Sequence, residues 1–148
     1  MRKLTEFLNQ RKFKRILDVG TGNGNFIKMI ASMTDSFEEI IGIDEMEVAV
    51  STSSKNFEDE RITFQLMSGY KMDFEKDSFD MVCLSNTLHH LDDVEGLFKE
   101  MERVLCPGGV ILVNEMIANG LSKRQKSHLK IHHFPYCKEQ WATGETYI

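Results

Sequence analysis

The segment 16–26, with the sequence ILDVGTGNGNF, constrains the fold of this chain more than any other feature. It begins with an apolar run, passes through Gly20, Gly22 and Gly24 at alternate positions, and leads into residues of helical character. Glycine adopts positive φ and lets the backbone approach a ligand closely. Unpaired N–H groups at the start of the next helix favour a carboxylate or phosphate there. The segment therefore predicts a strand, a ligand-binding loop and a helix, in that order.

Short apolar runs separated by segments of helical character predict the rest of the fold. The runs are residues 16–19, 40–43, 62–66, 81–84 and 110–113. Continuous apolar runs of this length are typical of strands that are covered on both faces. Because strands and helices alternate along the chain, right-handed crossovers and a parallel sheet are expected. We therefore expect an α/β protein with a Rossmann-like, doubly wound, mainly parallel sheet.

The clearest helix precedes the last apolar run. Its apolar residues stand at 94, 97, 98, 101, 104 and 105, which is one-sided helical spacing. Asp92 and Glu95 are three residues apart and predict a capping box at the start of the helix. Pro107 and the two glycines after it predict where the helix stops.

Composition and charge exclude several classes of protein. The 148 residues are 41% hydrophobic and 28% charged, as in an ordinary globular domain, so one domain is expected. No apolar run is long enough for a signal peptide or a membrane-spanning helix, and the three cysteines are scattered. We therefore expect a cytoplasmic protein with reduced thiols. Basic residues gather near both ends, but such patches are usually solvated surfaces, so nucleic acid is not the expected partner.

Two acidic residues narrow the class of ligand. Asp44 follows the second apolar run about twenty residues beyond the loop, where a carboxylate can accept hydrogen bonds from ribose hydroxyls. A dinucleotide fingerprint would need a third glycine at position 25, where this chain has Asn25. Asp18 stands just before the loop, and an acid there suits an ammonium group better than a pyrophosphate. A nucleoside with an amino group is favoured, and a nicotinamide-dependent oxidoreductase is the weaker alternative.

Residues 16–26 resemble motif I of the class I S-adenosylmethionine-dependent methyltransferases. The resemblance covers roughly residues 15–115 and includes the segments 77–82, 88–91 and 103–109. Within the family, the chain resembles the small-molecule branch typified by ubiquinone and menaquinone biosynthesis methyltransferases. The resemblance implies a single cofactor-binding domain, 1–148, with the sheet order 3-2-1-4-5. The antiparallel strands that usually follow are expected to be short or missing, because residues 116–148 show no strand-like run. We expect this end to be a helical tail or a partial segment over the substrate.

The resemblance also implies which residues bind S-adenosylmethionine. They are Asp18, Gly20, Thr21, Gly22, Gly24, Asp44, Glu45, Met46, Ser68, Gly69, Tyr70, Ser85 and Asn86. The glycine loop would pack against the methionine part of the cofactor, with Asp18 at its amino group, and Asp44 would hold the ribose. Ser68 stands where the family often has an acidic residue that contacts the adenine amino group. Because serine is uncharged, Met46 or Tyr70 would then add apolar cover to the base.

Catalytic side chains are optional in such an enzyme, because its main task is to hold the acceptor in line with the methyl group and to exclude water. His89 and His90 follow the fourth strand, and either could act as a general base. The alternative is that they only complete the turn before the next helix. His128 and His132 are four residues apart, but the residues between them lack the glutamate of a zinc protease motif, so no metal site is expected.

Two functions remain open at this point. The first is methyl transfer to a small-molecule acceptor by in-line displacement. The second is a catalytically weak or inactive methyltransferase-like module for binding or regulation, which Ser68 and the short end of the chain favour. Either the chain is a truncated or unusually short member of the family, or a partner subunit completes the sheet, for example in a homodimer.

Overall fold

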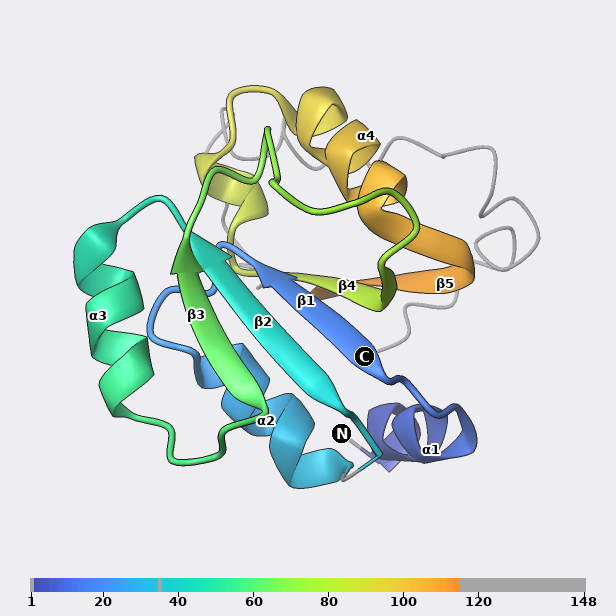
Figure 1. Ribbon diagram of the computed structural model, residues 1–148. Helices are drawn as coiled ribbons and strands as arrows, with labels where there is room; N and C mark the ends of the chain where they lie inside the picture. The colour runs from blue at the N-terminus through green and yellow to red at the C-terminus, as the bar shows by residue number, and fades with distance from the viewer. Residues whose placement is uncertain (1, 35, 115–148) are drawn as a thin grey trace, which may run out of the picture.

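The computed structural model describes residues 2–34 and 36–114, which form one parallel sheet with helices on both faces (Figure 1). The elements are α1 (Arg2–Gln10), β1 (Arg15–Val19), α2 (Asn25–Met33), β2 (Glu39–Asp44), α3 (Glu47–Lys55), β3 (Ile62–Leu66), β4 (Phe79–Ser85), the 3-10 turn η1 (Leu88–His90), α4 (Val94–Val104) and β5 (Leu105–Asn114). The tail 116–148 and Glu115 lie outside the described residues. Within the described ranges, no helix is long and apolar enough to span a membrane.

The sheet has the order β3-β2-β1-β4-β5, and every neighbouring pair is parallel. The predicted order and the predicted doubly wound architecture are confirmed. In the centre of the sheet, Leu17 of β1 is level with Ile41 of β2 and Val82 of β4. Because all strands run the same way, their carboxyl ends meet at one edge. The loops that follow β1, β2, β3 and β4 therefore meet at that edge.

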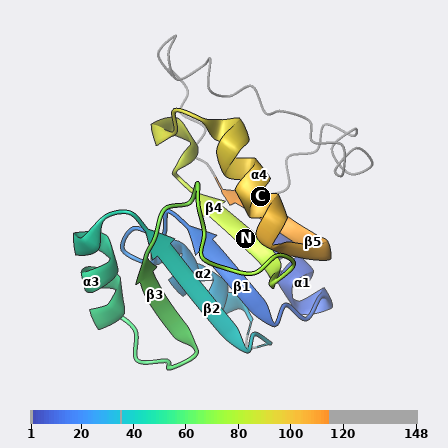
Figure 2. The ribbon, with the colours of Figure 1, turned by 45° about the horizontal axis from the view of Figure 1, so that its top comes forward.

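Alternate residues of the central strands pack into two separate cores. Ile16 and Ile40 belong to one core, which is covered by α1 and α2, and Leu17 and Ile41 belong to the other, which is covered by α4. Figures 1 and 2 show these helices on opposite faces of the sheet. The prediction of strands covered on both faces is confirmed for β1, β2 and β4. In β5 the predicted run 110–113 is half-buried, and its alternate residues pack against the two cores. The prediction is wrong for β3, an edge of the described sheet, where Thr63 and Leu66 are exposed.

The ends of α4 differ from the prediction by one to three residues. Asp93, not Asp92, caps the helix, and its side chain accepts a hydrogen bond of 2.9 Å from the backbone N–H of Gly96. The helix ends at Val104, and Pro107 lies inside β5 instead of at the end of the helix. A proline is tolerated there because β5 lies at an edge of the described sheet and its register shifts opposite residues 79–81. The capping box and the helix stop at Pro107 were therefore wrong in detail.

Helix α1 was not predicted, although it contributes to the core. Leu8 is fully buried, and Leu4 and Phe7 pack against the same cluster as α2. The spacing of these three residues is that of one helix face, and this signal was present in the sequence. Because Leu8 shares this core with Ile16 of β1 and with α2, helix α1 is part of the fold that supports the glycine loop.

Replacing Leu8 with alanine tests this role of α1. We expect Leu8→Ala to lower the free energy of unfolding by about 2–5 kcal/mol, because it leaves a cavity under the sheet. Urea denaturation followed by circular dichroism measures the change. Gln10→Ala, on the exposed end of the same helix, is the control and should change stability by less than about 0.5 kcal/mol. Equal effects of the two substitutions would contradict the packing described for α1.

Candidate functional site

The glycine loop after β1 has the backbone that its sequence predicts. Gly20 and Gly22 have φ of 67° and 54°, a region that other residues rarely adopt. A β-carbon on Gly20 would lie 2.8 Å from the side chain of Thr87, whereas one on Gly22 would meet no atom within 4 Å. Gly20 is thus required by close packing against the loop after β4. Gly22 faces open space at the carboxyl edge of the sheet, where a ligand can approach the backbone.

Asp44, at the end of β2, holds this loop. One of its carboxylate oxygens accepts a hydrogen bond of 2.9 Å from the N–H of Gly22, and the other accepts one of 2.9 Å from the N–H of Met46. The backbone of Thr21 also donates to the carbonyl of Ile43, at 3.0 Å. Each carboxylate oxygen has a further lone pair, so Asp44 can accept additional hydrogen bonds from a ligand hydroxyl. The predicted ligand residue is therefore also a structural residue of the loop.

Asp18 is the most unusual group in the site. Its side chain lies in β1, two residues before the glycine loop, and is only 2% exposed. Neither of its carboxylate oxygens has a hydrogen-bond partner among the described residues. The buried hydroxyl of Thr21 also has no partner there. Burial raises the pKa of Asp18 to about 7, the charge of Asp44 adds to the rise, and the nearby Thr21 opposes it. Buried polar groups almost always have partners, so this carboxyl is available to a cation or an ammonium group.

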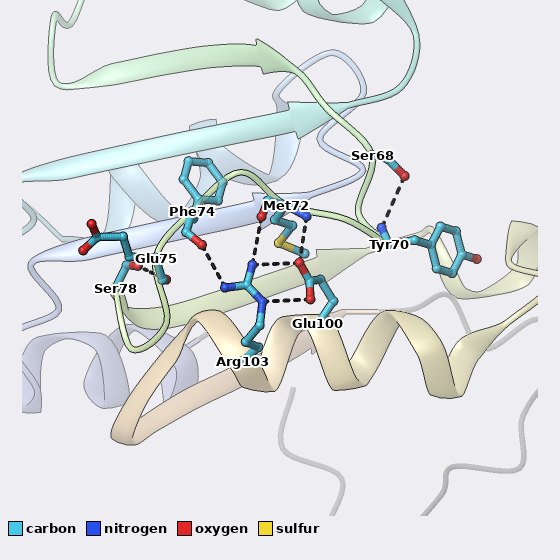
Figure 3. Close-up of polar contacts among 8 residues, drawn as sticks. All are labelled: Ser68, Tyr70, Met72, Phe74, Glu75, Ser78, Glu100 and Arg103. Carbon is cyan, nitrogen blue, oxygen red and sulfur yellow. Dashed lines mark hydrogen bonds and ion pairs between the residues drawn. The ribbon is translucent and has the colours of Figure 1, made fainter.

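The loop between β3 and β4 is anchored by α4, as Figure 3 shows. The guanidinium of Arg103 donates to the backbone carbonyls of Met72 and Phe74, both at 2.8 Å. Glu100 pairs with Arg103 and accepts a hydrogen bond of 2.7 Å from the N–H of Met72. Hydrogen bonding to Arg103 holds the pKa of Glu100 below its usual value. These contacts, which sequence reasoning missed, fix the path of the segment that carries Ser68, Gly69 and Tyr70.

Ser68 contacts a residue that follows β2. Its hydroxyl donates a hydrogen bond of 2.5 Å to the carboxylate of Glu45 and accepts one of 3.3 Å from the N–H of Tyr70. Gly69 packs between α4 and β1, because a β-carbon there would lie 2.8 Å from Leu97 and 2.9 Å from Val19. The predicted residues of this segment thus lie beside the predicted residues that follow Asp44.

Large apolar side chains are exposed at the same corner of the sheet. The four exposed large hydrophobic residues of the described part are Met46, Val48, Leu66 and Tyr70. They belong to the loop after β2, the first turn of α3, the end of β3 and the loop after β3. Exposed apolar groups gathered at one place are a common mark of a binding surface. A flat, partly apolar ligand group such as a purine suits this corner.

The loop after β4 adds the last predicted residues. The hydroxyl of Ser85 accepts a hydrogen bond of 3.0 Å from the side chain of Asn114 in β5. Asn86 has φ of 51°, and its N–H donates to the carbonyl of Asn114 at 2.8 Å. The hydroxyl of Thr87 donates to the carbonyl of Ser85 at 3.0 Å. Sequence reasoning missed Asn114 and Thr87, because their role depends on the pairing of β4 with β5 and on the approach to Gly20.

His90 lies in η1 and is exposed, and its N–H donates to the carbonyl of Thr87 at 3.0 Å. It stands at the same edge as the glycine loop, as the sequence predicts, but its role stays a prediction. The side chain of His89 and the residues His128 and His132 lie outside what the structure describes. A hollow of about 450 Å³ lies instead near the amino ends of β1 and β4, lined by Arg15 and residues 73–78, and contains none of the predicted site residues.

A doubly wound sheet with a glycine loop and an acid at adjacent strand ends is the arrangement found in nucleoside-binding α/β domains. Residues 17–113 match the model of a family described as a methyltransferase domain. The chain belongs to this family.

Relatives and solved structures agree with this assignment. The 27-O-demethylrifamycin SV methyltransferase of Amycolatopsis mediterranei is 30% identical over 117 residues, covering 78% of this chain and 43% of that protein. A ubiquinone/menaquinone biosynthesis C-methyltransferase of Geotalea daltonii is 36% identical over 110 residues, covering 68% and 45%. The crystal structure of an S-adenosylmethionine-dependent methyltransferase from Mesorhizobium loti matches with a TM-score of 0.60 and 29% identity, covering 67% and 45%. The chain therefore spans less than half the length of these proteins.

Asp18 gives the site a testable pH dependence. Its pKa is raised from 3.8 to about 7. Between about pH 4 and pH 7, the folded chain therefore still carries a proton on Asp18 that the unfolded chain has already lost. Stability should therefore fall as the pH rises through this window, by at most about 1.4 kcal/mol per pH unit from this group. Asp18→Asn keeps the shape but does not titrate. We expect its free energy of unfolding to exceed that of the wild type by more at about pH 8 than at about pH 5.

Urea denaturation of both proteins at the two pH values measures this difference. Because all other titrating groups are shared, they cancel in the comparison. A difference that is the same at both pH values would contradict a protonated, unpartnered Asp18.

Proposed function

We propose that this chain is the cofactor-binding core of an enzyme that transfers a methyl group from S-adenosylmethionine to a small-molecule acceptor. The observation that carries the proposal is the buried Asp18 carboxyl, which has no partner among the described residues and lies beneath a glycine loop held by Asp44. A dinucleotide would bring a pyrophosphate close to this acid, which electrostatics disfavours. A methionine-bearing nucleoside brings an ammonium group instead.

The methionine part of the cofactor would lie along the glycine loop. Asp18 would accept hydrogen bonds from its ammonium group, which compensates a buried acid that is otherwise costly. Thr21, whose hydroxyl also lacks a partner in the described part, supplies a second polar atom beside it. Gly22 leaves room for the ligand at the backbone. The orphan atoms and the open loop thus fit this end of the cofactor.

The ribose and the adenine would extend from β2 toward β3. Asp44 has lone pairs to accept from the ribose hydroxyls in addition to its backbone hydrogen bonds. Met46 and Tyr70 supply exposed apolar surface for the adenine, with Glu45 and Ser68 as its polar neighbours. Because β3 and β1 lie on opposite sides of β2, the two ends of the cofactor would occupy different strand ends.

When bound, S-adenosylmethionine supplies an electrophilic methyl group on its sulfonium. The chain's own residues would then orient the acceptor and exclude water, which accounts for much of the acceleration in such reactions. Ser85 and Asn86 would form the wall of the site at the end of β4, held by Asn114. His90 or His89 would remove the proton of the acceptor as a general base.

The class of acceptor and the cellular setting belong to the same proposal. The named acceptors of the relatives are small molecules, which supports a small-molecule acceptor over nucleic acid. Cys83 and Cys106 are free thiols within the described part of the chain, which supports a reducing compartment such as the cytoplasm. The homodimer suggested by the sequence also stays a proposal, and it rests on the outer edge of β5, which pairs with no further strand in the described sheet.

A second candidate function is a module that binds the cofactor without turnover. It is favoured by Ser68, an uncharged residue where the resemblance leads us to expect an acid. Binding assays do not separate this candidate from the first, whereas formation of S-adenosylhomocysteine in the presence of an acceptor does.

Calorimetric titration with S-adenosylmethionine, S-adenosylhomocysteine and NAD tests the cofactor class. We expect both adenosyl compounds to bind and NAD not to bind. Asp44→Ala should weaken binding of the adenosyl compounds by roughly 1–3 kcal/mol, because it removes charge-assisted hydrogen bonds to the ribose and frees the loop at Gly22. Glu58→Ala, which removes an exposed acid between α3 and β3, is the matched control. If neither adenosyl compound binds, the proposal is wrong. If Asp44→Ala and the control bind these compounds with equal affinity, Asp44 is not part of the site.

The proposed general base is tested by turnover. Metabolite extracts are screened for acceptors by following S-adenosylhomocysteine formation, and His90→Ala and His89→Ala are then compared on the best acceptor. We expect one of them to lower kcat by about a hundredfold or more while the affinity for S-adenosylhomocysteine stays within about twofold of the wild type. If both variants keep the wild-type kcat, neither histidine is the base.

A further inference from the structure

The Ser68 hydroxyl makes two hydrogen bonds that together determine what it can offer a ligand. It donates to the carboxylate of Glu45, which is 23 residues away in the sequence, and accepts from the N–H of Tyr70. The backbone of Met67 donates to the carbonyl of Asp44 at 3.0 Å, so the segment after β3 is also tied to the end of β2. The side chain of Ser68 thus stands beside the residues that would bind a ribose.

A serine hydroxyl has one proton to donate and two lone pairs to accept with. The proton of Ser68 is committed to Glu45, and one lone pair is used by Tyr70. Toward any further group, Ser68 can therefore only accept. An ionised Glu45 also only accepts, so the pair offers acceptors and no side-chain donor at this point.

The position of the pair indicates which part of a ligand it meets. This step rests on the proposed function, in which the ribose binds to Asp44 and the amino acid part extends toward β1. The base must then extend the other way, because the sheet order places β3 on the far side of β2 from β1. At the end of β3 the base would reach exposed Met46 and Tyr70, beside the hydrogen bond by which Ser68 joins the loop after β3 to the loop after β2. The edge of a purine would face the acceptor pair.

We propose that Glu45 is a positioning residue that makes Ser68 a hydrogen-bond acceptor only, and that the two together select a 6-amino purine over a 6-oxo purine. An adenine amino group donates and is matched by the pair. The carbonyl oxygen of a 6-oxo purine accepts and would face two further acceptors. Discrimination at the base is thereby achieved without an acidic residue at position 68.

The experiment compares S-adenosylhomocysteine with S-inosylhomocysteine, which differ in the group at purine position 6, by calorimetric titration of the full chain. The wild type should prefer the adenosyl compound by about tenfold, which is the range expected for one matched hydrogen bond against one repulsive contact. In Glu45→Gln, the glutamine amide can donate to Ser68, and the serine proton is then free to donate to a 6-oxo group. We expect the adenosyl compound to bind more weakly, the inosyl compound more tightly, and the preference to fall to about twofold or less.

Two further variants separate this effect from a loss of structure. Glu47→Gln makes the same change of charge in the first turn of α3 and should keep the wild-type preference. Ser68→Asp added to Glu45→Gln introduces an acceptor that needs no partner, and it should restore a preference of about fivefold or more. A merely structural role of Glu45 would not raise the affinity for the inosyl compound.

The outcomes for the two proposals are distinct. If the wild type binds S-adenosylhomocysteine but Glu45→Gln keeps the same preference, the role of the Glu45–Ser68 pair is overturned and the proposed function stands. If Glu45→Gln loses the preference for S-adenosylhomocysteine but the added Ser68→Asp does not restore it, the claim that a hydrogen-bond acceptor at position 68 selects the 6-amino purine is overturned. If the wild type binds neither compound, the proposed function itself falls, together with this inference.

Discussion

The carboxylate of Asp44 joins the two loops between which a nucleoside would lie. Its two oxygens accept from the backbone of Gly22 and from the backbone of Met46, so the loop after β1 and the loop after β2 share one anchor. The parallel sheet makes this possible, because β1 and β2 are neighbours and end at the same edge. Without this carboxylate, the backbone of Gly22 would lose its hydrogen bond to the end of β2, and the hydrogen bond from Thr21 to Ile43 would still tie the loop to that strand.

The two aspartates of the site differ in their hydrogen-bond partners. Asp44 accepts hydrogen bonds from the backbone, whereas Asp18 is buried with no partner in the described part of the chain. A buried carboxyl without partners lowers stability unless it keeps its proton or meets a cation. The protein thus holds a costly group where a positively charged ligand would compensate it. This combination of a satisfied acid and an unsatisfied acid is what distinguishes the site from a mere loop of glycines.

The apolar runs predicted the strands and a parallel sheet, because these depend on local pattern and on spacing along the chain, whereas the order of the strands followed from the resemblance to the family. The sequence did not reveal the contact between Ser68 and Glu45, since two loops far apart in sequence meet only through the register of β2 and β3. The same reason hid Asn114 beside Ser85. Helix α1 was missed although its apolar spacing was visible. The cap of α4 was misplaced because Asp92 and Asp93 are adjacent, and only the structure shows that Asp93 accepts the hydrogen bond from Gly96.

The anchoring of the loop between β3 and β4 has a consequence for how such a site can change over evolutionary time. Arg103 and Glu100 bind this loop at the backbone atoms of Met72 and Phe74, not at its side chains. These hydrogen bonds to α4 do not depend on the identity of the two side chains, although Met72 and Phe74 also pack into or against the core. Exposed side chains of this loop, such as that of Tyr70, can therefore change while α4 holds the backbone of Met72 and Phe74 in the same place.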